Sequence, residues 1–152
     1  MSIYADSSFI IATRVLQDNF HRKALEFYEG REEEVWLWSP WHRIEVFNTI
    51  RQLTRHPDST RSLSQGEAKA LIRRLEKDVQ LGYFVHLEAD WRDVLHTAGE
   101  ISAKNAFTRP CPAMDFLHIA YAKELAADAF VSFDEDQLSL AAASGLSTIN
   151  PA

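Results

Sequence analysis

Short runs of apolar or β-branched residues recur along the chain and predict strands. Five such runs occupy residues 2–5, 35–38, 83–88, 129–133 and 147–150. Each is almost continuously apolar, as strands are when a sheet is covered on both faces. The pattern therefore favours a central sheet between helices.

In the segments between these runs, apolar residues recur at the spacing of amphipathic helices. Ser39 followed by Pro40 indicates a helix start, and Ser64 with Glu67 has the spacing of a capping box. Gly82 is expected to stop the helix that Ser64 begins. Helices are predicted over residues 7–16, 20–29, 39–53, 64–82, 90–105 and 112–127. Alternating strands and helices predict an α/β fold, a three-layer α/β/α sandwich around a mostly parallel five-stranded sheet.

Length and composition are those of a soluble globular protein with one domain over residues 1–152. The chain is 46% hydrophobic and 25% charged, and no apolar run approaches the ~20 residues that a membrane span needs. The N-terminus lacks the basic region of a signal peptide, and the single cysteine, Cys111, has no partner for a disulfide. We expect a cytoplasmic protein that does not interact with membranes.

The net charge of −6 argues mildly against a nucleic-acid-binding protein. That argument weakens if several acids gather in one metal pocket. With five of the 22 acids set aside, 17 remain against 16 basic residues, which is close to neutral.

Two aspartates directly follow strand runs. Asp6 follows the first strand and Asp134 follows the fourth. Ligands of open α/β sheets bind outside the carboxyl ends of the strands, where the strand order reverses. If these two strands are neighbours there, the carboxylates face each other. The alternative is that each aspartate only begins a turn or caps the next helix.

Two further acids stand near the starts of helices. Glu45 lies on the polar side of the helix that follows the second strand, and a solvated helix face is its alternative explanation. Asp115 lies in the first or second turn of its helix, where the helix dipole alone would favour it. His118, three residues later, is expected at the edge of the site. We predict that all four acids converge on one rim.

These motifs resemble the PIN domain, in particular the VapC-like toxin nucleases. The resemblance rests on "IYADSSFII", "SPWHRIEVFN", "AMDFLHIAYA" and "AFVSFDEDQL", in this order over essentially the whole chain. It implies that Asp6, Glu45, Asp115 and Asp134 are the catalytic, metal-binding acids. Asp136 stands where some members have a further ligand, and Ser7, Ser8 and Ser132 match small hydroxyl residues of the pattern.

Carboxylates without cysteine are hard oxygen ligands that suit Mg²⁺ or Mn²⁺ rather than zinc. The resemblance implies divalent-metal-dependent endonucleolytic cleavage of an RNA substrate, a cognate antitoxin protein as partner, and a homodimer. Clustered carboxylates disfavour each other's ionisation, so at least one carboxyl pKa should lie above ~4. Arg14, Arg43, Arg51 or Lys104 could hold the RNA backbone, and no spacing argument selects among them.

Two other functions remain open at this point. A phosphotransfer or phosphatase domain of the haloacid-dehalogenase type would need Asp-x-Asp after the first strand, but Asp6 is followed by Ser7 and Ser8. A receiver domain would need an aspartate after the third strand and a lysine after the fifth, and neither is convincing here. The other alternative is a PIN-like module that binds RNA or protein without cutting.

Overall fold

The computed structural model describes all 152 residues and alternates strands with helices as predicted. The elements, in chain order, are β1 (Ser2–Ala5), α1 (Ser7–Ala12), α2 (His21–Glu29), β2 (Val35–Trp38), α3 (Pro40–Gln52), α4 (Gln65–Gln80), β3 (Val85–His86), α5 (Trp91–Asn105), α6 (Ala113–Glu124), β4 (Ala129–Val131), α7 (Glu135–Ala143) and β5 (Thr148–Ile149). The predicted start signals hold. Ser39 and Ser64 both form capping boxes, and Gly82 follows α4 with a φ of 82° that suits glycine.

The five strands form one sheet in the order β3-β2-β1-β4-β5. All four strand pairs are parallel, so the sheet is entirely rather than mostly parallel. The strand order reverses between β1 and β4, where Ile3 pairs with Ala129 and Ala5 with Val131. The two strands that precede Asp6 and Asp134 are therefore neighbours at the switch point, as expected.

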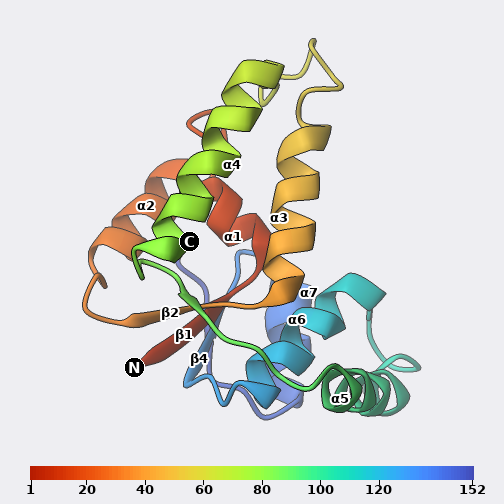
Figure 1. Cartoon of the computed structure of the whole chain (residues 1–152). Helices are drawn as coiled ribbons and strands as arrows, with labels where there is room; N and C mark the ends of the chain where they lie inside the picture. The colour runs from red at the N-terminus through yellow and green to blue at the C-terminus, as the bar shows by residue number, and fades with distance from the viewer.

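Helices cover both faces of the sheet, which gives the predicted three layers (Figure 1). Helices α1 to α4 pack on one face over a cluster that includes Phe9, Val46 and Leu75. Helices α5 to α7 pack on the other face over a cluster that includes Ile119 and Leu140. Because both faces are buried, the central strands are apolar throughout rather than alternating.

The structure differs from the sequence prediction in three places. Helix α7 was not predicted. Strand β3 pairs over only two residues, because it is an edge strand and its flanking residues Tyr83 and Leu87 are exposed. The first helix ends at Ala12, where Thr13 caps it and donates its hydroxyl to the carbonyl of Ile10.

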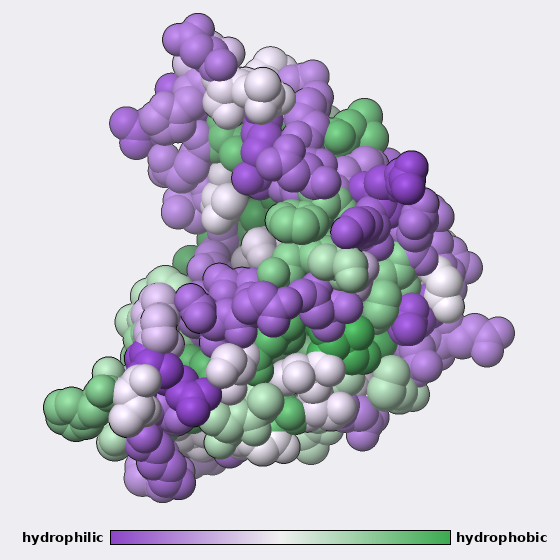
Figure 2. All heavy atoms as spheres, turned by 180° about the vertical axis from the view of Figure 1, so that it is seen from behind, coloured by the Kyte–Doolittle hydropathy of each residue, from purple (hydrophilic) through white to green (hydrophobic).

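Helices α3 and α4 form a hairpin that extends away from the sheet (Figure 1). From behind, hydrophilic residues cover most of the outer end of this hairpin, and the surface is hollowed between the hairpin and the body below it (Figure 2). None of the helices is both long and apolar enough to cross a membrane.

Candidate functional site

The four acids singled out in the sequence line one pocket of about 230 Å³. Asp6 and Asp134 come from the carboxyl ends of β1 and β4, Glu45 from α3, and Asp115 from the first turn of α6. The pocket's other lining residues are Ser7, Ser8, Ile11, Thr49, Arg61, His118 and Gln137. The pocket therefore lies at the switch point of the sheet, where an open α/β fold binds its ligands.

Asp6 is buried and held by three hydrogen bonds. Its Oδ1 accepts the backbone N–H of Phe9 at 2.8 Å, which caps α1. Its Oδ2 accepts the hydroxyls of Ser8 at 2.6 Å and Ser132 at 2.9 Å. Burial raises the pKa of Asp6, although these hydrogen bonds and His118 oppose the shift. The carboxylate is thus fixed in place by the chain itself.

Ser132 connects the two strand ends. Its hydroxyl donates to Asp6 and accepts the backbone N–H of Asp134 at 2.9 Å. Asp134 in turn caps α7, since its Oδ1 accepts the N–H groups of Asp136 at 2.9 Å and Gln137 at 3.1 Å. Asp6 and Asp134 therefore each cap a helix as well as lining the pocket, so both explanations considered for them hold together.

Glu45 contacts His118, which lies inside the site rather than at its edge as predicted. The Glu45 carboxylate accepts from Ser7 Oγ at 2.5 Å and from His118 Nε2. His118 is only 2% exposed. Burial alone would raise the pKa of Glu45, but the hydrogen bond and charge of His118, with the Ser7 hydroxyl, hold that pKa below its ordinary value.

The orientation of the His118 ring is fixed from its other side. A carboxylate only accepts hydrogen bonds, so Nε2 carries the proton that faces Glu45. Nδ1 lies 2.9 Å from the Tyr4 hydroxyl, which holds the ring from that side. Tyr4 also lies 3.0 Å from Ser39 Oγ, at the start of α3. Sequence reasoning missed Tyr4, because a tyrosine within an apolar strand looks like an ordinary core residue.

His42 ties α3 to the end of β1. Its Nδ1 accepts the N–H of Ser39 at 2.9 Å, and its Nε2 donates to the carbonyl of Ala5 at 2.7 Å. Burial, assisted by the charge of nearby His118, places the pKa of His42 well below its ordinary value, so the ring is neutral. This bond anchors the first turn of α3 beside Asp6, and Glu45 follows on the same helix.

Asp115 accepts no hydrogen bond from the chain. Burial raises its pKa to about 6, and the charges of Asp134, Asp6 and Glu45 add to the rise, against the opposing effect of His118. The direction expected from clustered carboxylates is seen at Asp115, whereas at Asp6 the rise comes from burial. The position of Asp115 in the first turn of α6 also suits the helix dipole, yet burial and the neighbouring acids still leave its pKa raised.

The fifth predicted ligand, Asp136, lies outside the pocket. It is exposed in the first turn of α7 and does not line the cavity. The first turn of a helix rotates successive side chains by about 100°, so a residue two positions after Asp134 faces elsewhere.

Two residues that line the pocket were not predicted as site residues from the sequence. Gln137 is 3% exposed, and its Oε1 has no hydrogen-bond partner within the chain. Arg61, from the loop before α4, lines the pocket while pairing with Asp18 at 2.5 Å. Both come from segments that sequence analysis left unassigned, the start of α7 and the α3–α4 loop.

The donor chemistry of the pocket fits Mg²⁺ or Mn²⁺. Its ionisable oxygen donors are carboxylates, its only imidazole has both nitrogens engaged, and no cysteine lines it. As the side chains stand, however, no three of them are grouped closely enough to hold an ion together. Three of the four acids accept hydrogen bonds from the chain, which hold them in separate positions.

The fold and this pocket define a parallel α/β protein with a carboxylate-lined site at the switch point of its sheet. The family model of the PIN domain matches residues 3–143, and the chain belongs to the PIN-domain family. The predicted PIN-like fold is confirmed.

Solved structures share the fold, and two of them align over nearly the whole chain. The crystal structure of FitAcB from Neisseria gonorrhoeae superposes with a TM-score of 0.72 at 20% identity, over 99% of this chain and 98% of that one. The structure of FitAB bound to an IR36 DNA fragment superposes with a TM-score of 0.69 at 19% identity, over 99% of this chain and 95% of that one. No curated protein sequence matches the chain significantly.

Proposed function

We propose that this protein is a divalent-metal-dependent endoribonuclease, acting as a single PIN-like nuclease domain over residues 1–152. The observation that carries the proposal is the convergence of Asp6, Glu45, Asp115 and Asp134 on one pocket at the switch point of a PIN-family fold. These four acids are proposed as the catalytic and metal-binding residues.

Hydrogen bonds within the chain hold Asp6, Glu45 and Asp134, whereas Asp115 accepts none. Asp6 is fixed by Ser8, Ser132 and the start of α1, and Glu45 Oε2 by Ser7 and His118. Glu45 Oε1 has no partner in the chain. Asp115 has none either, and it is ionised above a pH of about 6, so both offer oxygens to the pocket. Mg²⁺ or Mn²⁺ bound there would stabilise the attacking and leaving oxygens of a displacement at phosphorus.

We propose further that the protein is the toxin of a toxin–antitoxin pair, with a cognate antitoxin and a homodimeric state. Its likeness to VapC-like nucleases and to FitAcB and FitAB supports this proposal. Leu16 and Phe20, from the apolar segment around α1 and α2, are 75% and 42% exposed and offer apolar surface for a partner helix.

The decisive experiment is cleavage of single-stranded RNA with Mn²⁺ or Mg²⁺, with EDTA as the metal-free condition. The wild-type protein should cut only with metal, and Asp6→Asn and Asp115→Asn should lose at least about 100-fold in rate, because even outer partners of metal sites cost up to that much. Asp136→Asn is the matched control, since it makes the same change outside the pocket, and it should remain active.

Two results would contradict the proposal. Cleavage that persists in Asp6→Asn and Asp115→Asn would show that the acids of the pocket do not take part in the reaction. RNA binding without any metal-dependent cleavage in the wild type would indicate a PIN-like binding module instead.

A further inference from the structure

Basic residues are concentrated in the α3–α4 hairpin. Residues 51–74 contain six lysines and arginines against two acids, a net charge of +4 in a chain whose total is −6. The six are Arg51, Arg55, Arg61, Lys69, Arg73 and Arg74. Such an asymmetry creates a local positive potential on an otherwise acidic protein.

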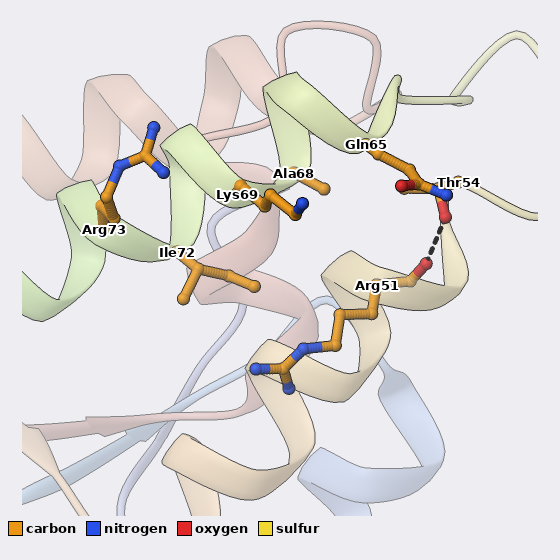
Figure 3. Close-up of a pocket in the computed structure, with 7 residues that line it drawn as sticks. All are labelled: Arg51, Thr54, Gln65, Ala68, Lys69, Ile72 and Arg73. Carbon is orange, nitrogen blue, oxygen red and sulfur yellow. Dashed lines mark hydrogen bonds between the residues drawn. The ribbon is translucent and has the colours of Figure 1, made fainter.

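Three of these residues line a groove of about 500 Å³ between α3 and α4. Arg51 comes from α3, and Lys69 and Arg73 from α4 (Figure 3). The remaining lining residues are Thr54, Gln65, Ala68 and Ile72, so no acid borders the groove.

The groove cations are exposed and form no ion pair or hydrogen bond through their side chains. Two of the other cations considered from sequence are neutralised, and the third, Lys104, is exposed and unpaired but lines a different pocket beside Glu100. Arg14 pairs with Asp78 at 3.1 Å, and Arg43 with Glu76 at 2.8 Å. Of the four cations considered for the RNA backbone from sequence, Arg51 is therefore the one that lies unpaired in a basic groove.

We propose that the α3–α4 groove binds the phosphate backbone of single-stranded RNA next to the segment held in the acidic pocket. This inference rests on the proposed ribonuclease function. A single strand presents phosphates at regular intervals, and each one neutralised by a cation releases counterions.

Helix α3 lies between the two sites and contributes side chains to both. Glu45 and Thr49 line the acidic pocket on one side, and Arg51 lines the groove on the other. A helix is about 10 Å across, so a few nucleotides span it. The exposed surface between the sites carries Asn48 and Gln52, and Arg55 donates to Gln52 there at 3.3 Å. A strand crossing α3 therefore meets polar and basic side chains.

The composition of the groove favours RNA over a protein partner. A helical peptide docks through an apolar stripe, and here only Ala68 and Ile72 are apolar. An acidic peptide is the competing occupant that the charge would also admit, and the experiment includes it as a probe.

Binding is measured in the Asp115→Asn background, so that the RNA stays intact. The probe is a fluorescein-labelled single-stranded RNA of about 12 nucleotides, within the span that such grooves cover. The groove variant combines Arg51→Gln, Lys69→Gln and Arg73→Gln. The matched control combines Arg22→Gln, Lys23→Gln and Lys77→Gln, which removes the same charge from exposed helical positions outside the groove. Thermal melts confirm that both variants fold.

The groove variant should bind the RNA at least about tenfold more weakly than the control at low salt. Its slope of log K against log salt should fall by about 2, since each phosphate contact on a single strand contributes about 0.7. A single-stranded DNA of the same sequence should lose affinity equally, because the backbone phosphate is common to both.

Cleavage separates this inference from the proposed function. With Asp115 restored, the groove variant should lose about tenfold in kcat/KM on the long RNA and nothing on an RNA of about three nucleotides, too short to cross α3. If neither the wild type nor any variant cuts RNA, the proposed function fails. The binding measurement still shows whether the groove binds RNA. Equal RNA binding by groove variant and control would overturn the inference. Loss of affinity for an oligo-glutamate peptide, with RNA binding intact, would also overturn it.

Discussion

Burial and three neighbouring carboxylates all disfavour the ionised form of Asp115. Its pKa is about 6 in the folded protein and about 3.9 in an unfolded chain. The folded state thus holds the proton more tightly than the unfolded state. Ionising Asp115 therefore costs stability, and this cost grows as the pH rises from about 4 to about 6 and then stays constant.

Asp115→Asn removes that cost, so we expect the metal-free variant to be at least as stable as the wild type above pH 6. The advantage should shrink as the pH falls toward 4, where the wild-type carboxyl is protonated too. Urea denaturation of both proteins in EDTA between pH 4 and 8 measures the difference. An advantage that stays constant over this range would show that the pKa of Asp115 is not raised in the folded protein.

At the scale of a single element, α7 depends on the residue that also completes the pocket. Asp134 Oδ1 accepts two backbone N–H groups from the first turn of α7. This bond needs an oxygen at that position but not a negative charge, whereas a metal ligand of the proposed kind needs the charge. The two roles can therefore be separated by substitution.

Asp134→Ala should lower the free energy of unfolding by about 1 kcal/mol, because it removes the cap, while Asp134→Asn should cost little. Both variants should lose metal-dependent nuclease activity. Chemical denaturation gives the first quantity and an RNase assay the second. If the asparagine variant is destabilised as much as the alanine variant, the interaction of the charge with the helix dipole matters more than the hydrogen bond.

At the scale of the whole molecule, the pocket joins both layers of the fold. Glu45 comes from a helix on one face of the sheet, and Asp115 and His118 from a helix on the other. Asp6 and Asp134 lie far apart in sequence and meet only because β1 pairs with β4. An ion that draws these acids together therefore binds the folded chain and has no equivalent site in the unfolded one.

Mn²⁺ should accordingly raise the melting temperature of the whole protein. At a concentration of 100 times its Kd the gain is about 2.7 kcal/mol, or several degrees for a chain of this size. Asp115→Asn should lose most of this gain and Asp136→Asn should keep it. Differential scanning calorimetry with and without Mn²⁺ tests this expectation, and an equal gain in the two variants would place the ion outside the pocket.

The sequence by itself determined the five strands, six of the seven helices and the acids at their ends. Short, continuous apolar runs favour strands of a sheet that is covered on both faces, and capping signals such as Ser39 and Ser64 are local. Asp6 and Asp134 followed from the same logic, because the residue after a parallel strand always lies at the carboxyl-end rim. The short helix α7 was not predicted from the sequence, because its segment is rich in alanine and leucine and lacks a clear polar stripe.

Only the tertiary structure decided which side chains around those acids belong to the site. Along the chain Tyr4 looked like a core residue and His118 was expected only at the edge of the site. The contacts of His118 with Glu45 and with Tyr4 depend on how α6 packs against α3 and β1. Asp136 was expected as a further ligand from the resemblance alone, but helix rotation places it outside the pocket. The groove of Arg51, Lys69 and Arg73 likewise exists only because α3 and α4 lie side by side. Local pattern fixes where an element begins and ends, whereas a contact between distant residues depends on packing that no local pattern encodes.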